Sequence, residues 1–263
     1  MVYHICKEKD LKLKCDKIIS MDTYALNNDI ILIGASVFLK SESVLIIGDI
    51  HLGLEEELNQ RGVLIPRHEL NRNLKKIEEI LGTLQKKKLK VKTLIVNGDL
   101  KHDFGTINQQ EWREINKFLD FLNKKFERVI LVKGNHDNLL EPIIRKRSLD
   151  MKNYVMIKDK LITHGHKIYK ISYRHDIKTI IIGHEHPAIV LDDGIRKETF
   201  KTFLIGKWRR KTLIVMPSFC SVTVGSDVRE GTISPFLSES KLQRFKVIVL
   251  GDKLYNFGKL KEI

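Results

Sequence analysis

The segment VLIIGDIH, residues 44–51, joins a run of four branched apolar residues to a glycine, an aspartate and a histidine. A short, wholly apolar run of this kind is typical of a strand that is buried on both faces. Asp49 and His51 stand two positions apart, and on an extended segment such side chains point to the same side. The segment therefore predicts a buried strand that brings a carboxylate and an imidazole to one place.

Four further apolar runs lead into similar groups of polar residues. The runs are 93–96, 129–132, 161–163 and 179–182, and the groups are Asn97-Gly98-Asp99, Gly134-Asn135-His136-Asp137, His164-Gly165-His166 and Gly183-His184-Glu185-His186. Oxygen and imidazole donors suit Mn²⁺, Fe²⁺, Ni²⁺ or Zn²⁺. One such group alone is more often a cap or a turn, but five in order, each after an apolar run, predict a metal site at one rim of the sheets. Glu185, between two candidate ligands, is expected to point away from it.

The order of the predicted elements favours an α/β fold. Helical spacing of apolar residues predicts helices over 66–88 and 109–126, and a short helix near 139–147, between the early strands. Further strands are predicted on either side of these helices. They are 30–33 and 36–39 before the helices and 154–157, 188–191, 201–205, 212–216 and 245–250 after them. We expect a single domain over residues 1–263, with the metal-binding groups in 44–190 and with C-terminal strands within 200–250 completing a second sheet.

Composition restricts the classes of function. Of 263 residues, 42% are hydrophobic, and only 5 are proline, which excludes a low-complexity or disordered chain. The formal charge of +14 favours a polyanionic partner, although lysine-rich surfaces also arise from genome composition or adaptation to heat.

Cysteine usage and hydropathy bear on location. Cys6, Cys15 and Cys220 form no paired spacing, so we expect neither a disulfide framework nor a thiolate zinc site. This fits a reducing cytoplasm. Met1–Ser20 lacks a signal-like apolar run, and the longest apolar stretch, 30–39, is too short to span a bilayer, so no membrane association is expected.

The ordered set of Gly-Asp-x-His, Gly-Asp, Gly-Asn-His-Asp, His-Gly-His and Gly-His-x-His resembles the calcineurin-like metallophosphoesterase superfamily. The resemblance covers Asp49 to His186. It implies a four-layer α-β-β-α sandwich of two mixed sheets with flanking helices and a two-metal site at the strand ends. Carried onto this sequence, it implies these ligands: Asp49, His51 and His186 for one metal, Asn135, His164 and His184 for the other, and Asp99 as the bridge. Mn²⁺ is the expected ion, with Ni²⁺, Fe or Zn²⁺ as alternatives.

The same resemblance implies further roles. His136 is expected to face the scissile phosphate as a general acid or a stabiliser of charge. The sequence segments Gly48–Gly53 and Gly98–His102 are similar to those of SbcD-type repair nucleases and their small relatives, including the ligase-associated phosphodiesterases. In that group a histidine often lies beside the site three positions after the bridging aspartate. This matches His102 and implies a catalytic role for it, in which it orients His136 or contacts the substrate; the alternative is that His102 caps the next turn. Asp137 and His166 are expected to support the metal ligands without binding an ion themselves, and His166 is equally compatible with an ordinary loop residue.

We therefore expect a metal-dependent hydrolase of phosphodiester bonds, acting on nucleic acid or nucleotides in a nuclease-like role such as DNA repair. Substrate-binding candidates are Arg61 and the basic run around Trp208, Arg209 and Arg210, where the indole would stack on a base and the guanidinium groups would hold the backbone. The alternative for that run is a solvated face. Two other functions stay open, namely hydrolysis of a cyclic nucleotide or a small phosphomonoester, and a metal-bound interaction scaffold without turnover.

Overall fold

A computed structural model describes residues 21–103, 105, 109–192, 194 and 196–263. Met1–Ser20, with Cys6 and Cys15, lie outside the described residues. Cys220 is buried. None of the helices in the described part of the chain is both long and apolar enough to cross a bilayer.

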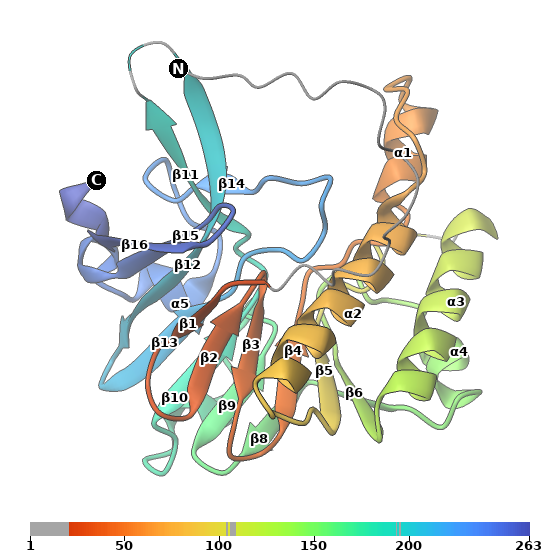
Figure 1. The fold of residues 1–263 in the computed structure, drawn as a ribbon, viewed down its shortest axis with the longest axis horizontal. Helices are drawn as coiled ribbons and strands as arrows, with labels where there is room; N and C mark the ends of the chain where they lie inside the picture. Colours follow the sequence, from red (N-terminus) through yellow and green to blue (C-terminus); the bar gives the residue numbers. More distant parts are fainter. Residues whose placement is uncertain (1–20, 104, 106–108, 193, 195) are drawn as a thin grey trace.

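Seven strands form the first sheet in sequence order (Figure 1). They are β1 (Thr23–Ala25), β2 (Ile30–Ile33), β3 (Ser36–Leu39), β4 (Val44–Ile47), β5 (Thr93–Asn97), β6 (Arg128–Val132) and β7 (Asp150–Lys152). Neighbours from β1 to β4 are antiparallel and those from β4 to β7 are parallel. The sheet is therefore mixed, and its parallel half brings the carboxyl ends of β4, β5 and β6 to one edge.

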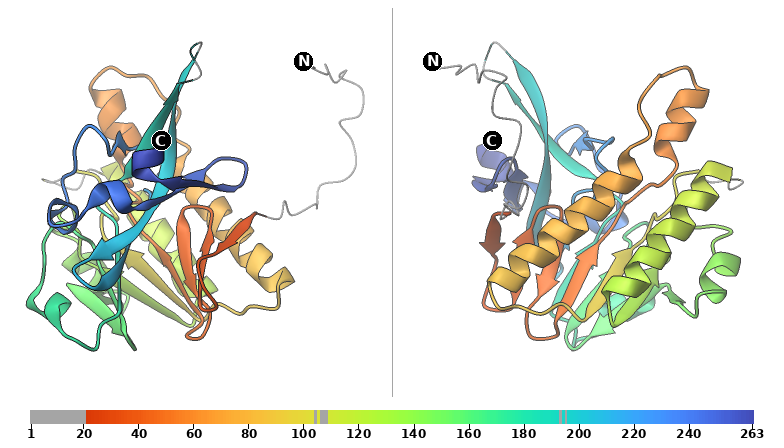
Figure 2. Two further views of the ribbon diagram at one scale, coloured as in Figure 1. Left: turned by 90° about the vertical axis from the view of Figure 1, so that its left-hand side faces the viewer. Right: turned by 45° about the vertical axis from the view of Figure 1, so that its right-hand side comes forward.

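Helices connect the parallel strands and cover one face of this sheet. α1 (Leu54–Gln60) and α2 (Glu69–Lys86) follow β4, α3 (Gln109–Lys125) follows β5, and α4 (Glu141–Arg145) follows β6. The right view of Figure 2 shows α2 and α3 side by side across the sheet. α2 begins three residues after Pro66, where we expected its start, because the Glu55 carboxylate accepts hydrogen bonds from the backbone N–H groups of His68 and Glu69.

Nine strands form the second sheet, which is also mixed. They are β8 (Tyr154–Ile157), β9 (Lys160–Thr163), β10 (Thr179–Ile182), β11 (Pro187–Asp192), β12 (Lys197–Trp208), β13 (Lys211–Val215), β14 (Ser226–Asp227), β15 (Lys246–Leu250) and β16 (Leu254–Lys259). β10 is parallel to both β9 and β13, while β12 is antiparallel to β11, β13 and β15. The short helix α5 (Pro235–Ser238) and the 3₁₀ segments Lys170–Tyr173, Leu242–Arg244 and Leu260–Glu262 complete the described elements of this half.

Three apolar layers hold the sheets and helices together. Leu45 and Ile47 of β4 pack toward the helices, whereas Val44 and Ile46 pack between the two sheets against β10 and β13. A third cluster lies on the outer face of the second sheet and includes Phe236 of α5. Both faces of the central strands are therefore buried, as their unbroken apolar sequences predict. The expected α/β fold of two mixed sheets with flanking helices is confirmed.

Candidate metal centre

The five predicted groups of polar residues meet at one edge of the two sheets. The loops after β4 and β5 are joined by hydrogen bonds from Asp49 N to Gly98 O (3.0 Å) and from His51 N to Asp99 O (3.0 Å). The loops after β9 and β10 are joined by the bond from Gly183 N to His164 O (2.8 Å). Parallel neighbours end at the same edge of a sheet, and these edges of the two sheets lie together, so that Asp49 contacts His186, 137 positions away in sequence.

The first group of candidate ligands consists of Asp49, His51 and His186, whose donor atoms lie within 4.8 Å of one another. Nε2 of His51 is 3.1 Å from Nε2 of His186, and Oδ1 of Asp49 is 3.4 Å from that same His186 nitrogen. Two nitrogens at about 2.1 Å from one ion and at right angles would be about 3.0 Å apart. The observed separation fits two ligands of a single cation.

The second group consists of Asp99, His164 and His184. Nε2 of His164 lies 3.2 Å from Oδ2 of Asp99 and 3.0 Å from Oδ1 of Asn135. The same Asp99 oxygen is 3.9 Å from Nε2 of His51, which belongs to the first group. The Asp99 carboxylate therefore lies between the two groups.

Contacts at Nδ1 of His164 and His51 leave Nε2 of each ring for metal binding. Nδ1 of His164 lies 3.1 Å from the carbonyl oxygen of Asn97, which orients Nε2 toward Asp99 and Asn135. Nδ1 of His51 lies 3.2 Å from Nδ1 of His102, and Nε2 of His102 lies 2.8 Å from the Glu57 carboxylate. In the tautomers consistent with these contacts, His102 Nε2–H donates a hydrogen bond to Glu57 and His51 Nδ1–H donates one to His102 Nδ1, which leaves His51 Nε2 with a free lone pair.

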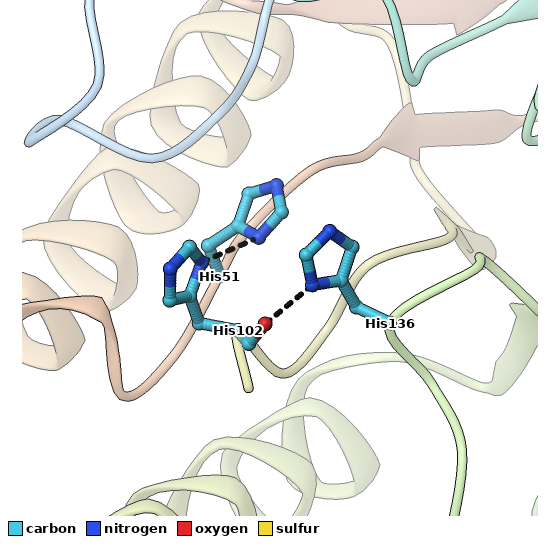
Figure 3. Close-up of side chains that lie close together, drawn as sticks. All are labelled: His51, His102 and His136. Atoms are coloured by element: carbon cyan, nitrogen blue, oxygen red, sulfur yellow. Dashed lines mark hydrogen bonds between the residues drawn. The ribbon is translucent and has the colours of Figure 1, made fainter. Parts of the chain in front are cut away.

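Figure 3 shows how His51, His102 and His136 converge. The backbone N–H of His136 donates to Oδ1 of Asp99 (3.0 Å), and its ring Nδ1 contacts the carbonyl oxygen of His102. Nε2 of His136 is thereby turned toward Oδ2 of Asp99, at 3.8 Å. His136 thus lies beside both groups of candidate ligands, and His102 contacts both of its histidine neighbours.

The other predicted residues hold the loops or line the site. Asp137 is buried and accepts hydrogen bonds from the backbone N–H groups of Leu100 and Gly134, each at 2.8 Å. The His166 ring lies 5.3 Å from that of His164, and its Nδ1 has no hydrogen-bond partner among the described residues. Glu185 points away, as expected, since its carboxylate accepts hydrogen bonds from the backbone N–H groups of residues 233 and 234.

Two features of the site lie outside the sequence predictions. Glu57, which contacts His102, comes from α1, a short acidic helix that shows no apolar periodicity. Ser218, after β13, donates from its hydroxyl to the carbonyl oxygen of Asp49 (2.8 Å).

The backbone at the ligands differs from our expectation. Asp49, His51, His184 and His186 lie beyond the ends of β4 and β10 and have positive φ values of 54°, 50°, 67° and 47°. The side chains of each pair converge through left-handed turns rather than through the alternation of an extended segment, so that geometric argument was wrong. Such φ values cost of order 1–3 kcal/mol each and persist only where the surroundings over-determine them.

Glycine is needed where the loops pack against the ligands. A Cβ atom at Gly183 would overlap the Asp49 carboxylate, and one at Gly134 would overlap the Asp99 carboxylate. Neither glycine has a positive φ. Space for a carboxylate, rather than backbone conformation, therefore requires glycine at these two positions.

Burial of His164 is outweighed by the Asp99 and Asp49 carboxylates, which raise its pKa to about 9. Burial keeps two other candidate imidazole ligands neutral. It lowers the pKa of His51 to about 3, helped by the neighbouring His186 ring. It also lowers the pKa of His184 to about 4, helped by His164. Neutral imidazole is the form that offers a lone pair to a metal ion.

The carboxylates of the site are held ionised. Burial would raise the pKa of Asp49, but His186 and His164 outweigh it and hold that pKa below its ordinary value. Burial of Asp99 is likewise outweighed by His164, which keeps the pKa of that carboxyl low. Two buried, ionised carboxylates, imidazole nitrogens and one amide oxygen form a donor set that fits divalent cations.

The predicted substrate-binding residues do not gather at this edge. Arg61 is exposed and pairs with Glu57 on α1, one contact away from His102. Trp208 is completely buried, packs against Tyr173 and Phe236, and donates from Nε1 to Glu239 (3.1 Å). The expectation that its indole stacks on a base is wrong, because no face of the ring is accessible.

Trp208→Ala is expected to lower the free energy of unfolding by about 3–5 kcal/mol, since it removes a large side chain from the core. Trp112→Ala is the matched control, because Trp112 is 40% exposed; a loss below about 1 kcal/mol is expected there. Equilibrium urea denaturation measures both. Equal losses in the two variants would contradict the assignment of Trp208 to the core.

Comparison with known proteins gives a family match and a fold match. Residues 43–173 match the family described as calcineurin-like phosphoesterase. The fold is similar to that of the Pseudomonas putida nuclease MPE, with 14% identity, a TM-score of 0.63, and coverage of 90% of this chain and 100% of that chain. A protein of unknown function from Aquifex aeolicus, AQ665, matches with 22% identity over 54% of this chain and 77% of that chain, with a TM-score of 0.35. No curated protein matches significantly.

Proposed function

Because residues 43–173 match the calcineurin-like phosphoesterase family, we propose that the protein is a hydrolase of phosphodiester bonds that uses two divalent metal ions. Asp49, His51 and His186 would hold one ion, and Asn135, His164 and His184 the other. One observation carries the proposal: Oδ2 of Asp99 lies 3.2 Å from His164 Nε2 and 3.9 Å from His51 Nε2, between the two groups. A carboxylate in that place suits a shared ligand.

When bound, such a pair of ions supplies charge neutralisation for the phosphate and an activated water. The protein's own contribution is orientation and proton transfer. Nδ1 of His136 contacts the carbonyl oxygen of His102, which leaves Nε2 on the side of Asp99. We assign His136 the task of holding, at Nε2, the proton that the leaving oxygen takes up.

We assign His102 a positioning role rather than the catalytic one that the sequence suggested. Its Nδ1 contacts His51 and its Nε2 contacts Glu57, so both ring nitrogens are engaged. Its carbonyl oxygen meets the His136 ring. His102 thus orients one candidate metal ligand and the proton donor together.

The proposed substrates are nucleic acids or nucleotides. The formal charge of +14 supports an anionic polymer as substrate. The similar structure from Pseudomonas putida is described as a nuclease, which supports the same class without identifying the substrate of this chain. Within that class we propose a relative of the SbcD-type and ligase-associated phosphodiesterases, active with Mn²⁺ and engaged in DNA repair or nucleic-acid processing.

The test is turnover of an aryl phosphodiester beside the matching monoester. Metal-stripped protein should hydrolyse neither ester, and titration with Mn²⁺ or Ni²⁺ should restore cleavage of the diester, because the site has ligands for ions and no other source of an activated nucleophile among its described side chains. Zn²⁺ and Mg²⁺ complete the series. Defined DNA, RNA and cyclic nucleotides then identify the natural class.

Preference for the monoester would contradict the diesterase proposal and favour a small phosphatase. Stoichiometric metal binding without turnover of any ester would contradict catalysis and favour an interaction scaffold. Metal content, measured by elemental analysis on the same samples, separates this second outcome from a failure to load the ions.

A further inference from the structure

A basic pocket lies on the second sheet, away from the candidate metal centre. Its cavity has a volume of about 810 Å³. Five lining side chains are cationic, and the acidic side chain among them is that of Asp159. The five are Lys178, Lys207, Arg209, Arg210 and Lys211. Three segments far apart in sequence supply the lining, so the pocket exists only in the folded chain.

The strands separate this pocket from the site of the proposed hydrolysis. Lys178 directly precedes β10, and Lys211 begins β13, which is parallel to β10. The candidate ligands His184 and His186 follow the other end of β10. Four strand residues span roughly 13 Å, so the pocket and the metal centre lie at opposite ends of the same strands. In Figure 1 the turn between β12 and β13 lies at the lower left of the molecule.

Neighbouring groups hold three of the cations in place. Lys211 Nζ donates to the carbonyl oxygen of Ile177 (2.9 Å), and Lys207 Nζ donates to the Thr212 hydroxyl (3.0 Å). The Arg209 guanidinium lies 4.9 Å from the centre of the Tyr173 ring. Cations that are already ordered lose less conformational entropy when an anion binds.

The turn between β12 and β13 also brings charge to the pocket. Trp208 pairs with Lys211, so Arg209 and Arg210 form a two-residue hairpin turn. Arg209 has φ = 54°, a conformation that such turns usually give to glycine or asparagine. Along β12 the exposed Lys207 alternates with the buried Trp208, at which the strand ends, and Arg209 and Arg210 are exposed in the turn; an aromatic core residue thus stands within a basic run.

Two cations of the pocket are available to a ligand. Lys178 and Arg210 are exposed, and neither side chain makes a hydrogen bond or an ion pair with another described residue. Asp159 is partly neutralised, because its carboxylate accepts a hydrogen bond from Lys160 Nζ (3.2 Å). The pocket therefore presents a surplus of positive charge.

We propose that this pocket binds a phosphate-bearing anion at a site separate from the metal centre, with Lys178 and Arg210 as its direct contacts. Arginine binds phosphate with paired donors and lysine binds it as a point charge. Nucleic-acid backbone and free nucleotides share this chemistry. A cavity of this volume has the size of a small-ligand site. Its open side would also admit a nucleic-acid strand that passes over the turn between β12 and β13.

The test uses metal-stripped protein, so that the proposed catalytic ions contribute nothing. The probe is a fluorescently labelled oligothymidylate, followed by anisotropy at low salt, with ATP and pyrophosphate as competitors. The double variant Lys178→Glu/Arg210→Glu should bind at least about tenfold more weakly. Lys117→Glu/Lys124→Glu on α3 changes the net charge equally at exposed lysines outside the pocket, and it should retain binding within about threefold.

Equal weakening in both double variants would overturn the proposal, since it would show attraction to total charge alone. Unchanged binding in the pocket variant, or no binding of any probe by the wild type, would overturn it as well. If the oligonucleotide binds more tightly than ATP, the ligand of the pocket is a nucleic-acid strand; if ATP binds more tightly, the ligand is a free nucleotide. Hydrolysis of a small aryl phosphodiester should be unchanged in the pocket variant, which separates this proposal from the proposed function.

Discussion

His136→Ala is expected to lower the rate of diester hydrolysis by about 10²–10⁴-fold while metal content stays at the wild-type level. Contacts at its backbone N–H and at ring Nδ1 hold the residue, so that Nε2 lies 3.8 Å from the Asp99 carboxylate. Removal of the ring takes away the proton for the leaving oxygen and leaves every candidate ligand in place. Single-turnover rates, with elemental analysis of the same protein, measure the effect.

The leaving group sharpens this test. A nitrophenolate leaves without protonation near neutral pH, whereas the alkoxide of a nucleic-acid strand needs a proton. The loss in His136→Ala should therefore be larger for DNA or RNA than for the nitrophenyl ester. His68→Ala, at an exposed histidine beside α2, is the control and should retain full activity. An equal loss on both substrates would contradict the assignment of His136 as proton donor.

Asp99→Asn is expected to lower hydrolysis by at least about a thousandfold and to reduce the number of metal ions bound at saturation. The substitution keeps the size of the side chain but removes the charge that lies between His164 and His51. It also replaces one carboxylate oxygen by an NH₂ group, which cannot bind a cation. Equilibrium dialysis against Mn²⁺ gives the stoichiometry, and the diester assay gives the rate.

Asp120→Asn is the matched control, because Asp120 is exposed and pairs with the partly buried Arg147 on the helix side of the molecule. Surface pairs of this kind contribute about 0–1 kcal/mol, so metal binding and turnover should both be unchanged. Full activity with two bound ions in Asp99→Asn would remove the basis for a shared carboxylate and, with it, the two-ion proposal.

Much of the fold was predictable from local patterns. The strands 30–33, 36–39, 44–47, 154–157 and 179–182 have the predicted bounds, and the two long helices differ by at most three residues at either end. Apolar runs and helical periodicity report burial directly, so such elements can be read from the sequence. α1 was missed because its residues are mainly acidic and its stability depends on contacts made elsewhere in the molecule.

The order and identity of the candidate ligands were also present in the sequence. Each apolar strand is followed at once by its polar group, and parallel strands bring such groups to one edge. The family match agrees with that pattern over residues 43–173. Chemical type and position along the chain therefore predicted which polar groups gather at this edge, whereas the division of the ligands between two ions came from the family resemblance.

The tertiary structure alone decided what each side chain meets. The basic run itself does not show that Trp208 is buried at the end of β12 while Arg209 beside it is exposed in the turn; that depends on where the strand ends and which of its faces meets the core. Likewise His102 lies against Glu57 and His51 because two loops meet in space. Sequence by itself determined the strands, the long helices and the donor set, because these follow from periodicity and residue chemistry. Ring orientation, the burial of Trp208 and the remote basic pocket depended on contacts between distant segments, which no local pattern records.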